Sequence, residues 1–185
     1  MTNLNLARTA AERPPILDAV EDNIGFVPNL FATLAATPGA AEAFIALDSA
    51  FSASSLTPTE RQIVLLTASL ENDGRYCVAG HTVFANSIGV PTAVVDAIRS
   101  DTPLDDDRLA ALSAFVRQLV RQKGQPTAAQ TAAINDAGFA REQIVEIILG
   151  IALKTISNYV DNSVGLVLDE QFLPGAWAGT AGVHA

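Results

Sequence analysis

Apolar residues recur with helical spacing along nearly the whole chain. The apolar stripe of the segment before Gly124, for example, consists of Leu109, Leu112, Val116, Leu119 and Val120. No segment shows the alternation of apolar and polar residues that is typical of a half-exposed strand. Proline and glycine separate the helical segments, as at Pro28 and Pro38. The pattern predicts an all-α protein.

The predicted helices follow one another with short connections. They cover residues 16–21, 29–36, 39–51, 57–70, 75–88, 92–98, 105–123, 126–136 and 139–159. The clearest start is at Thr57, where a capping hydroxyl is followed by a first-turn proline and by the carboxylate of Glu60. The acidic run 105–107 precedes a helix that ends in basic residues, so it indicates a helix start rather than a metal site. The apolar stretch 144–156 predicts a central or interface helix.

The length and composition fit one domain. With 185 residues and 49% hydrophobic content, the chain is long enough to bury a sizeable core. Within residues 1–185 we expect N-terminal helices over 15–55, a core over 56–172 and a flexible tail over 174–185, in which Trp177 is a candidate anchor. The polar residues just after the apolar stretch recur at helical spacing, and we interpret them as a solvated or interface face in preference to a substrate-binding set: Lys154, Ser157, Asn158 and Asp161.

The charge balance restricts the partners. A net charge of -9 opposes binding to nucleic acid or to an anionic membrane surface. No secretory signal, uninterrupted membrane span, metal-binding motif or cofactor-binding motif is apparent. We therefore expect a soluble, cytoplasmic protein that uses neither a metal nor a cofactor, and a single cysteine fits a reducing compartment.

The chemical candidate is Cys77, the only cysteine, which lies four residues before one of two histidines, His81. On a helix this spacing places thiol and imidazole on one face, and an imidazole beside a thiol can take its proton. The position of Cys77 in the first helical turn also favours a thiolate, and Gly80 leaves room beside it. Spacing alone leaves a second interpretation open, in which both side chains are simply packed in the core.

At these residues the chain resembles the alkylhydroperoxidase D-like and carboxymuconolactone decarboxylase-like proteins. The resemblance is carried by the segment 60–66 (ERQIVLL) and by the segment 76–82 (YCVAGHT), and it extends over about residues 26–172. Thiol members of that family carry a glutamate, a Cys-x-x-Cys pair and a histidine four residues after the second cysteine. The resemblance implies an all-helical, homo-oligomeric bundle in which Cys77 and His81 are the catalytic residues.

Two departures from the family pattern affect the mechanism. The first cysteine is replaced by Gly74 and the glutamate by Gln62, so the resolving thiol and the acid are absent. Gln62 is expected to orient His81 through a hydrogen bond or a water. Glu60 either substitutes as the acid or caps its helix. The hydroxyl of Tyr76 either touches a bound peroxide or belongs to a packed ring.

The resemblance implies a cysteine-dependent hydroperoxidase with one cysteine. Its substrate would be a hydroperoxide, and an external thiol or a protein reductant would complete the cycle. Two alternatives remain open from the sequence. One is a non-redox enzyme of the carboxymuconolactone decarboxylase kind, and the other is a non-catalytic oligomeric binding protein.

Overall fold

The computed structural model describes residues 13–178, which form helices and no strand. Its elements are α1 (Ile16–Ile24), α2 (Asn29–Leu34), α3 (Ala40–Ser52), α4 (Pro58–Glu71), α5 (Arg75–Ser87), α6 (Thr92–Arg99), α7 (Asp107–Arg121), α8 (Ala128–Asp136), α9 (Arg141–Val164) and the 3-10 helix η1 (Glu170–Gly175). Each predicted helix is present, so the all-α prediction is confirmed. The helix at the acidic run starts at Asp107, because the side chain of Asp106 caps it by accepting from the backbone N–H of Leu109.

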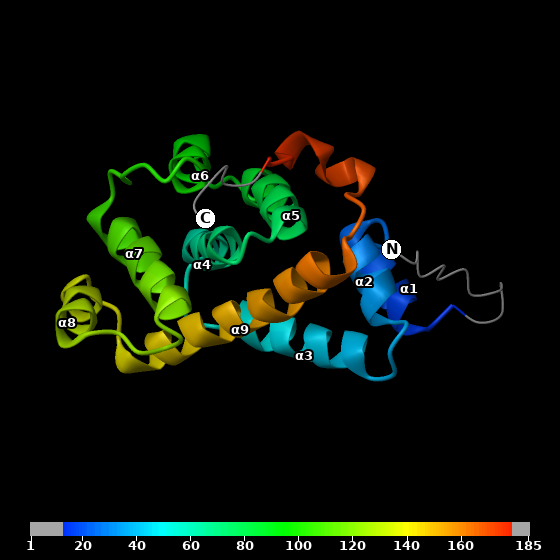
Figure 1. The fold of residues 1–185 in the computed structure, drawn as a ribbon, viewed down its shortest axis with the longest axis horizontal. Coiled ribbons are helices and arrows are strands. Elements are labelled where there is room, and N and C mark those ends of the chain that lie inside the picture. Colours follow the sequence, from blue (N-terminus) through cyan, green and yellow to red (C-terminus); the bar gives the residue numbers. More distant parts are fainter. Residues whose placement is uncertain (1–12, 179–185) are drawn as a thin grey trace.

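Helix α4 lies at the centre of the bundle, where α5, α7 and α9 pack around it (Figure 1). Its start follows the predicted capping box. The Glu60 backbone N–H donates to Thr57 Oγ1 at 3.2 Å, and the Thr57 N–H donates to Glu60 Oε2 at 2.8 Å. Residues 63–70 are all buried, which gives the neighbouring helices a continuous surface on which to pack.

Helix α9 crosses the molecule against α3, α4 and α5 (Figure 1). Gly150 allows a close approach to α3 and α4, because a Cβ atom there would lie 2.7 Å from the side chains of both Phe51 and Val64. By length and composition α9 could cross a membrane, with a mean hydropathy of 1.3 in its most apolar window. Core helices share these properties, and the buried polar residues of α9 pack against α4 and α5 as in a core helix.

The interpretation of the polar residues of α9 as a solvated or interface face is wrong. Lys154, Ser157, Asn158 and Asp161 are 3%, 0%, 0% and 9% exposed. Helix α9 continues to Val164, beyond the predicted end at residue 159, and this polar face is directed at α4 and α5. The side chains find polar partners there, which offsets part of the cost of burying them.

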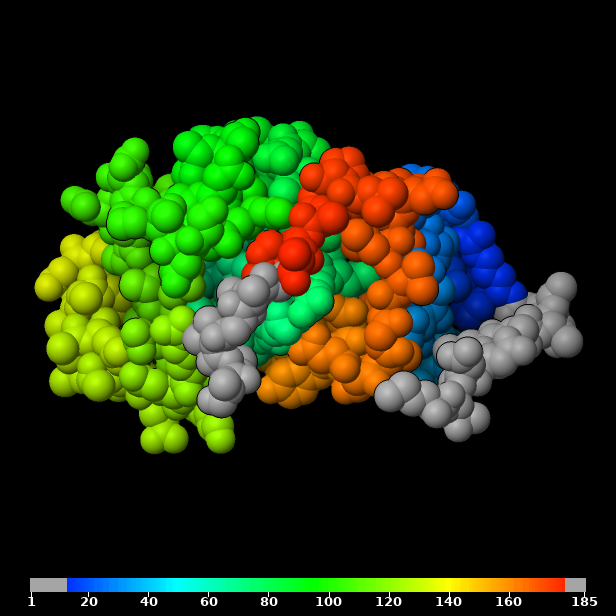
Figure 2. Space-filling view, turned by 45° about the horizontal axis from the view of Figure 1, so that its top comes forward, coloured from blue at the N-terminus to red at the C-terminus, as the bar shows by residue number. Residues whose placement is uncertain are grey.

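The chain after α9 returns across the bundle and packs on α5 (Figure 2). The sequence analysis did not predict η1, which contains Pro174. Arg99 of α6 holds its end by donating to the carbonyl oxygens of Gly175 at 2.8 Å and Ala176 at 2.9 Å. Trp177 packs partly buried against the core. The last part of the predicted flexible tail, residues 179–185, lies outside the described residues.

Candidate active site

Cys77 lies in the first turn of α5, at its third residue. The side chain is 4% exposed, and its Sγ donates to Ser157 Oγ of α9 at 3.3 Å. Ser157 Oγ in turn lies 3.3 Å from the carbonyl oxygens of Leu153 and Lys154. The thiol is therefore held by a hydroxyl on the neighbouring helix, and its hydrogen bond does not go to His81.

His81 lies one turn after Cys77 and is held from two sides. Its Nδ1 lies 3.1 Å from Gln62 Oε1 of α4, and its Nε2 lies 2.7 Å from Lys154 Nζ of α9. Because an ammonium group only donates, Nε2 accepts, and the ring proton is on Nδ1 and is donated to Gln62. The predicted hydrogen bond between Gln62 and His81 is confirmed.

The surroundings keep the imidazole neutral. Burial lowers the pKa of His81 well below its ordinary value, and the positive charge of Lys154 lowers it further. A neutral imidazole is the form that can accept a proton. The positive charge next to His81 is consequently carried by Lys154 and not by the imidazole.

A cavity of about 460 Å³ lies beside the thiol and the imidazole. Aromatic rings form much of its wall, namely those of Phe31, Phe44, Phe51, Tyr76, Phe84 and Phe172. Its polar or charged lining residues include Asp48, Arg61, Gln62, His81 and Lys154. The cavity wall therefore combines aromatic rings with polar and charged groups, a combination found in small-molecule sites.

Tyr76 contributes its ring to this cavity, but its hydroxyl is already engaged. The hydroxyl donates to Asp169 Oδ2 and accepts from the Leu30 backbone N–H at 3.3 Å. Burial and the hydrogen bond with Asp169 raise the pKa of Tyr76 far above its ordinary value. The structure thus places the hydroxyl in a contact between α2, α5 and the segment before η1, and the ring packs on Phe172.

Glu60 does not line the cavity. Besides capping α4, its Oε1 accepts from Arg108 Nε of α7 at 2.8 Å. Burial alone would raise the pKa of Glu60, but the hydrogen bonds from Thr57 and the ion pair with Arg108 outweigh it and lower the pKa. Of the two roles left open for Glu60, the structure shows the capping contact.

Gly74 and Gly80 have crowded surroundings. A Cβ atom on Gly74, where the family pattern has its first cysteine, would lie 2.2 Å from Asn158 Nδ2 and 2.9 Å from Asn158 Cβ. At Gly80 a Cβ would lie 3.3 Å from the ring of Phe172. Gly80 nevertheless lines the cavity beside Cys77, as expected, and only an added Cβ would meet the Phe172 ring. A side chain on residue 74 has no space while Asn158 is in place.

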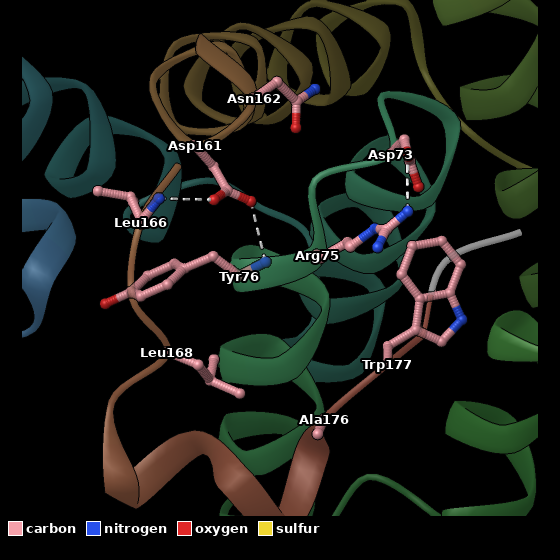
Figure 3. Close-up of a pocket in the computed structure, with 9 residues that line it drawn as sticks. All are labelled: Asp73, Arg75, Tyr76, Asp161, Asn162, Leu166, Leu168, Ala176 and Trp177. Atoms are coloured by element: carbon pink, nitrogen blue, oxygen red, sulfur yellow. Dashed lines mark hydrogen bonds and ion pairs between the residues drawn. The ribbon is translucent and has the colours of Figure 1, made fainter. Parts of the chain in front are cut away.

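A second cavity, of about 550 Å³, lies at the start of α5 (Figure 3). Asp161 joins its walls by accepting from the backbone N–H groups of Tyr76 at 3.0 Å and Leu166 at 3.3 Å. Arg75 lies between Asp73 and the Trp177 ring. Cys77 and His81 do not line this cavity, so it is separate from the thiol site.

The sequence analysis missed Lys154 and Ser157 as neighbours of the cysteine–histidine pair. It identified their spacing on one helix face but not the elements which that face contacts. The available signal was a lysine within a nearly continuous apolar stretch, since lysine is rarely fully buried without a partner.

No family model and no curated protein matches the chain, but solved structures do. One of them is an uncharacterized peroxidase-related protein with an alkylhydroperoxidase AhpD core from Ralstonia eutropha JMP134, with a TM-score of 0.76, 27% identity and 84% of each chain covered. The chain shares the fold of the alkylhydroperoxidase D-like proteins. Its helical bundle is the fold of that family, and the recognition based on residues 60–66 and 76–82 is confirmed.

Two further structures share the fold at lower identity. The debrominase Bmp8, solved as a cysteine-to-alanine variant with 2,3,4-tribromopyrrole, has 19% identity and a TM-score of 0.76, with 87% of both chains covered. A putative antioxidant defence protein of unknown function from Agrobacterium tumefaciens has 20% identity and a TM-score of 0.67, with 74% of this chain and 95% of that chain covered. The alkylhydroperoxidase D-like fold thus occurs in proteins described with different chemistry.

Proposed function

We propose that this protein is a cysteine-dependent hydroperoxidase that works with one cysteine. The observation that carries the proposal is the position of Cys77, which lies in a first helical turn and lines a cavity together with the neutral imidazole of His81. The first turn of a helix favours an anion, and a neutral base one turn later can accept the thiol proton. The likeness to a peroxidase-related protein with an alkylhydroperoxidase AhpD core supports the same chemistry.

In the proposed reaction the Cys77 thiolate attacks the terminal oxygen of a hydroperoxide. A sulfur–oxygen bond forms, the O–O bond breaks, and the leaving oxygen takes a proton to become an alcohol or water. The thiol is oxidised to a sulfenic acid while the peroxide is reduced. An external thiol or a protein reductant then forms a mixed disulfide with loss of water, and a second thiol restores Cys77. A reducing cytoplasm would supply such thiols.

His81 is proposed as the base for the thiol, with Gln62 fixing its tautomer. In the resting arrangement Nε2 accepts from Lys154, so the proposed role requires Lys154 to turn toward the bound substrate before the proton moves. Tyr76 and Glu60 are proposed to support the site by holding α5 and α4 in position. No step uses a cofactor.

We also propose that copies of the chain associate through α9. Its solvent face carries large apolar residues at helical spacing, including Val145, Ile148, Ile156 and Tyr159, which are 42–59% exposed. Such a stripe on the face opposite the buried polar residues is suited to packing against another copy. The association would be homo-oligomeric.

A second candidate function is removal of bromine from a small aromatic ring. The debrominase neighbour and the aromatic wall of the cavity favour it. The thiolate would take the bromine, a proton would replace it on carbon, and an external thiol would release bromide as a disulfide forms. Bromide release from 2,3,4-tribromopyrrole in the presence of a thiol distinguishes this function from peroxide reduction.

Trapping the oxidised cysteine tests the proposed function. The purified protein is mixed with hydrogen peroxide and with cumene hydroperoxide across pH, and a sulfenic acid at Cys77 is captured with a dimedone-type nucleophile. We expect labelling and thiol-dependent peroxide consumption, both absent in Cys77→Ser. His81→Ala should move the pH profile upward. If no adduct forms at any pH, the hydroperoxidase proposal fails, and activity retained in Cys77→Ser would indicate a non-redox enzyme.

A further inference from the structure

Lys154 is one of only two lysines in the sequence, and it is almost fully enclosed. Its exposed fraction is 3%, and its ammonium group donates to His81 Nε2 at 2.7 Å. The Phe44 ring centroid lies 6.0 Å from Nζ. An ammonium group has three N–H donors, and His81 accounts for one of them.

No residue of the part described, 13–178, forms an ion pair with this ammonium. The imidazole that it contacts is neutral, so it supplies no opposite charge. Buried charges in proteins are normally paired, because desolvation of an unpaired ion is costly. The buried ammonium group of Lys154 therefore lacks an anionic partner among residues 13–178.

Lys154 also lines the 460 Å³ cavity that contains Cys77. The other charged groups on this cavity are Arg61, whose guanidinium donates to the Leu56 carbonyl oxygen at 2.5 Å, and Asp48. Partial desolvation raises the pKa of Asp48, and the positive charge of Lys154 acts in the opposite direction. Asp48 lies beyond ion-pair distance of Lys154, so the cationic end of the cavity is open to an anion.

We infer that the cavity selects a substrate with an aromatic body and one carboxylate group, and that Lys154 binds the carboxylate. The aromatic body would lie among the rings of Phe31, Phe44 and Phe84. Lys154 contacts His81, and three residues later on α9 Ser157 contacts Cys77. A group held by Lys154 is consequently next to the thiol. This inference rests on the proposed function for the identity of the reaction. It adds to the proposed function the chemical class of the substrate.

Binding of a non-reactive pair of compounds tests the inference without turnover. The probes are 3-phenylpropionate and its neutral amide, 3-phenylpropanamide, which share the aromatic body. Titration calorimetry at pH 7.5 should show the carboxylate binding at least about tenfold more tightly than the amide to the wild-type protein, since a charged hydrogen bond in a desolvated site has this magnitude. Equal affinities for both compounds overturn the inference.

Two lysine substitutions test whether Lys154 causes the preference for the carboxylate over the amide. Lys154→Met should bring the two affinities within about twofold of each other, whereas Lys123→Met, at the exposed other lysine, should retain the preference. A preference retained in a folded Lys154→Met protein contradicts the inference. If Lys154→Met does not fold, Asp48→Asn is used, and it should increase the preference for the carboxylate because it removes a repelling charge.

Protection of the thiol locates the bound carboxylate. Saturating 3-phenylpropionate should slow alkylation of Cys77 by neutral iodoacetamide by about tenfold in the wild-type protein, and should have no such effect in Lys154→Met. Tight binding without protection places the anion elsewhere and overturns the inference. Because neither measurement involves a peroxide, failure of the hydroperoxidase proposal leaves these results interpretable.

Discussion

At the residue scale, Gly74 occupies the position of the first cysteine in the family pattern. The position is surrounded by the Asn158 side chain, which accepts from Asn72 Nδ2 at 3.1 Å and donates to Ser69 Oγ at 3.4 Å. The loss of the first cysteine is therefore accompanied by a buried asparagine that occupies its space. One substitution cannot restore a Cys-x-x-Cys pair in this structure.

Substitutions at Gly74 and Asn158 measure how strongly these two positions interact. Gly74→Ala should lower the free energy of unfolding by about 1–3 kcal/mol, because its Cβ overlaps a hydrogen-bonded, buried side chain. In an Asn158→Ala background the same change should cost less. Urea unfolding of the four proteins gives the coupling energy. Gly80→Ala, which meets only the edge of a ring, is the control, and equal costs at both glycines would contradict the steric explanation.

The depressed pKa of His81 predicts a pH dependence of stability. Below the unfolded pKa of about 6.5 the unfolded chain binds a proton that folded His81 does not, so stability falls as pH falls. Between pH 7.5 and 5.5 this contribution is about 1.4 kcal/mol. The difference in unfolding free energy between wild type and His81→Gln should decrease by that amount over this range. A difference that is constant with pH would show that His81 titrates normally.

Among the elements, α5 is positioned by contacts at its first turn and near its middle. Asp161 of α9 accepts from the Tyr76 N–H in the first turn, and Arg99 of α6 joins Thr82 to the last residue of η1. Phe172 of η1 packs on the rings of Tyr76 and Phe84. These contacts hold the helix that carries Cys77 and close one wall of the cavity.

Tyr76→Phe tests the contact between α5 and the C-terminal segment. The change keeps the ring but leaves Asp169 and the Leu30 N–H without their partner, so we expect a loss of about 1–3 kcal/mol of unfolding free energy. Hydrogen exchange of residues 166–178 should become faster. Tyr159→Phe, at the only other tyrosine and 59% exposed, should change neither quantity. Equal behaviour of the two variants would remove Tyr76 from this role.

In the whole molecule, α9 has two faces of different character. One face buries polar residues against the thiol site, and the other exposes a stripe of apolar residues. Substitution of the stripe therefore tests association between copies separately from the chemistry.

Ile148→Glu combined with Ile156→Glu should shift the protein to a lower molecular mass in analytical ultracentrifugation. Two charges placed in an apolar contact would each remain desolvated, which opposes association. Ala114→Glu, at an exposed position on α7, is the control and should leave the mass unchanged. A monomeric wild-type protein, or an unchanged mass in the double variant, would overturn the proposed association.

The helices and the placement of Cys77 and His81 on one helix face could be predicted from the amino-acid sequence. These features depend on local interactions, such as the capping box of Thr57 and Glu60 and the spacing of four residues. The family motif added the fold. Boundaries were predicted less well where tertiary contacts extend an element, as for α9, or create one, as for η1.

The surroundings of the thiol could not be predicted in this way, because they depend on how distant helices pack together. The contact between His81 and Lys154 joins residues 73 positions apart, and the contact between Cys77 and Ser157 joins residues 80 apart. Helical spacing shows that Lys154 and Ser157 share a face but not which element covers that face. The packing of α9 on α4 and α5 buries polar residues that would be solvated on an isolated helix. Two of them, Lys154 and Ser157, thereby become part of the candidate active site.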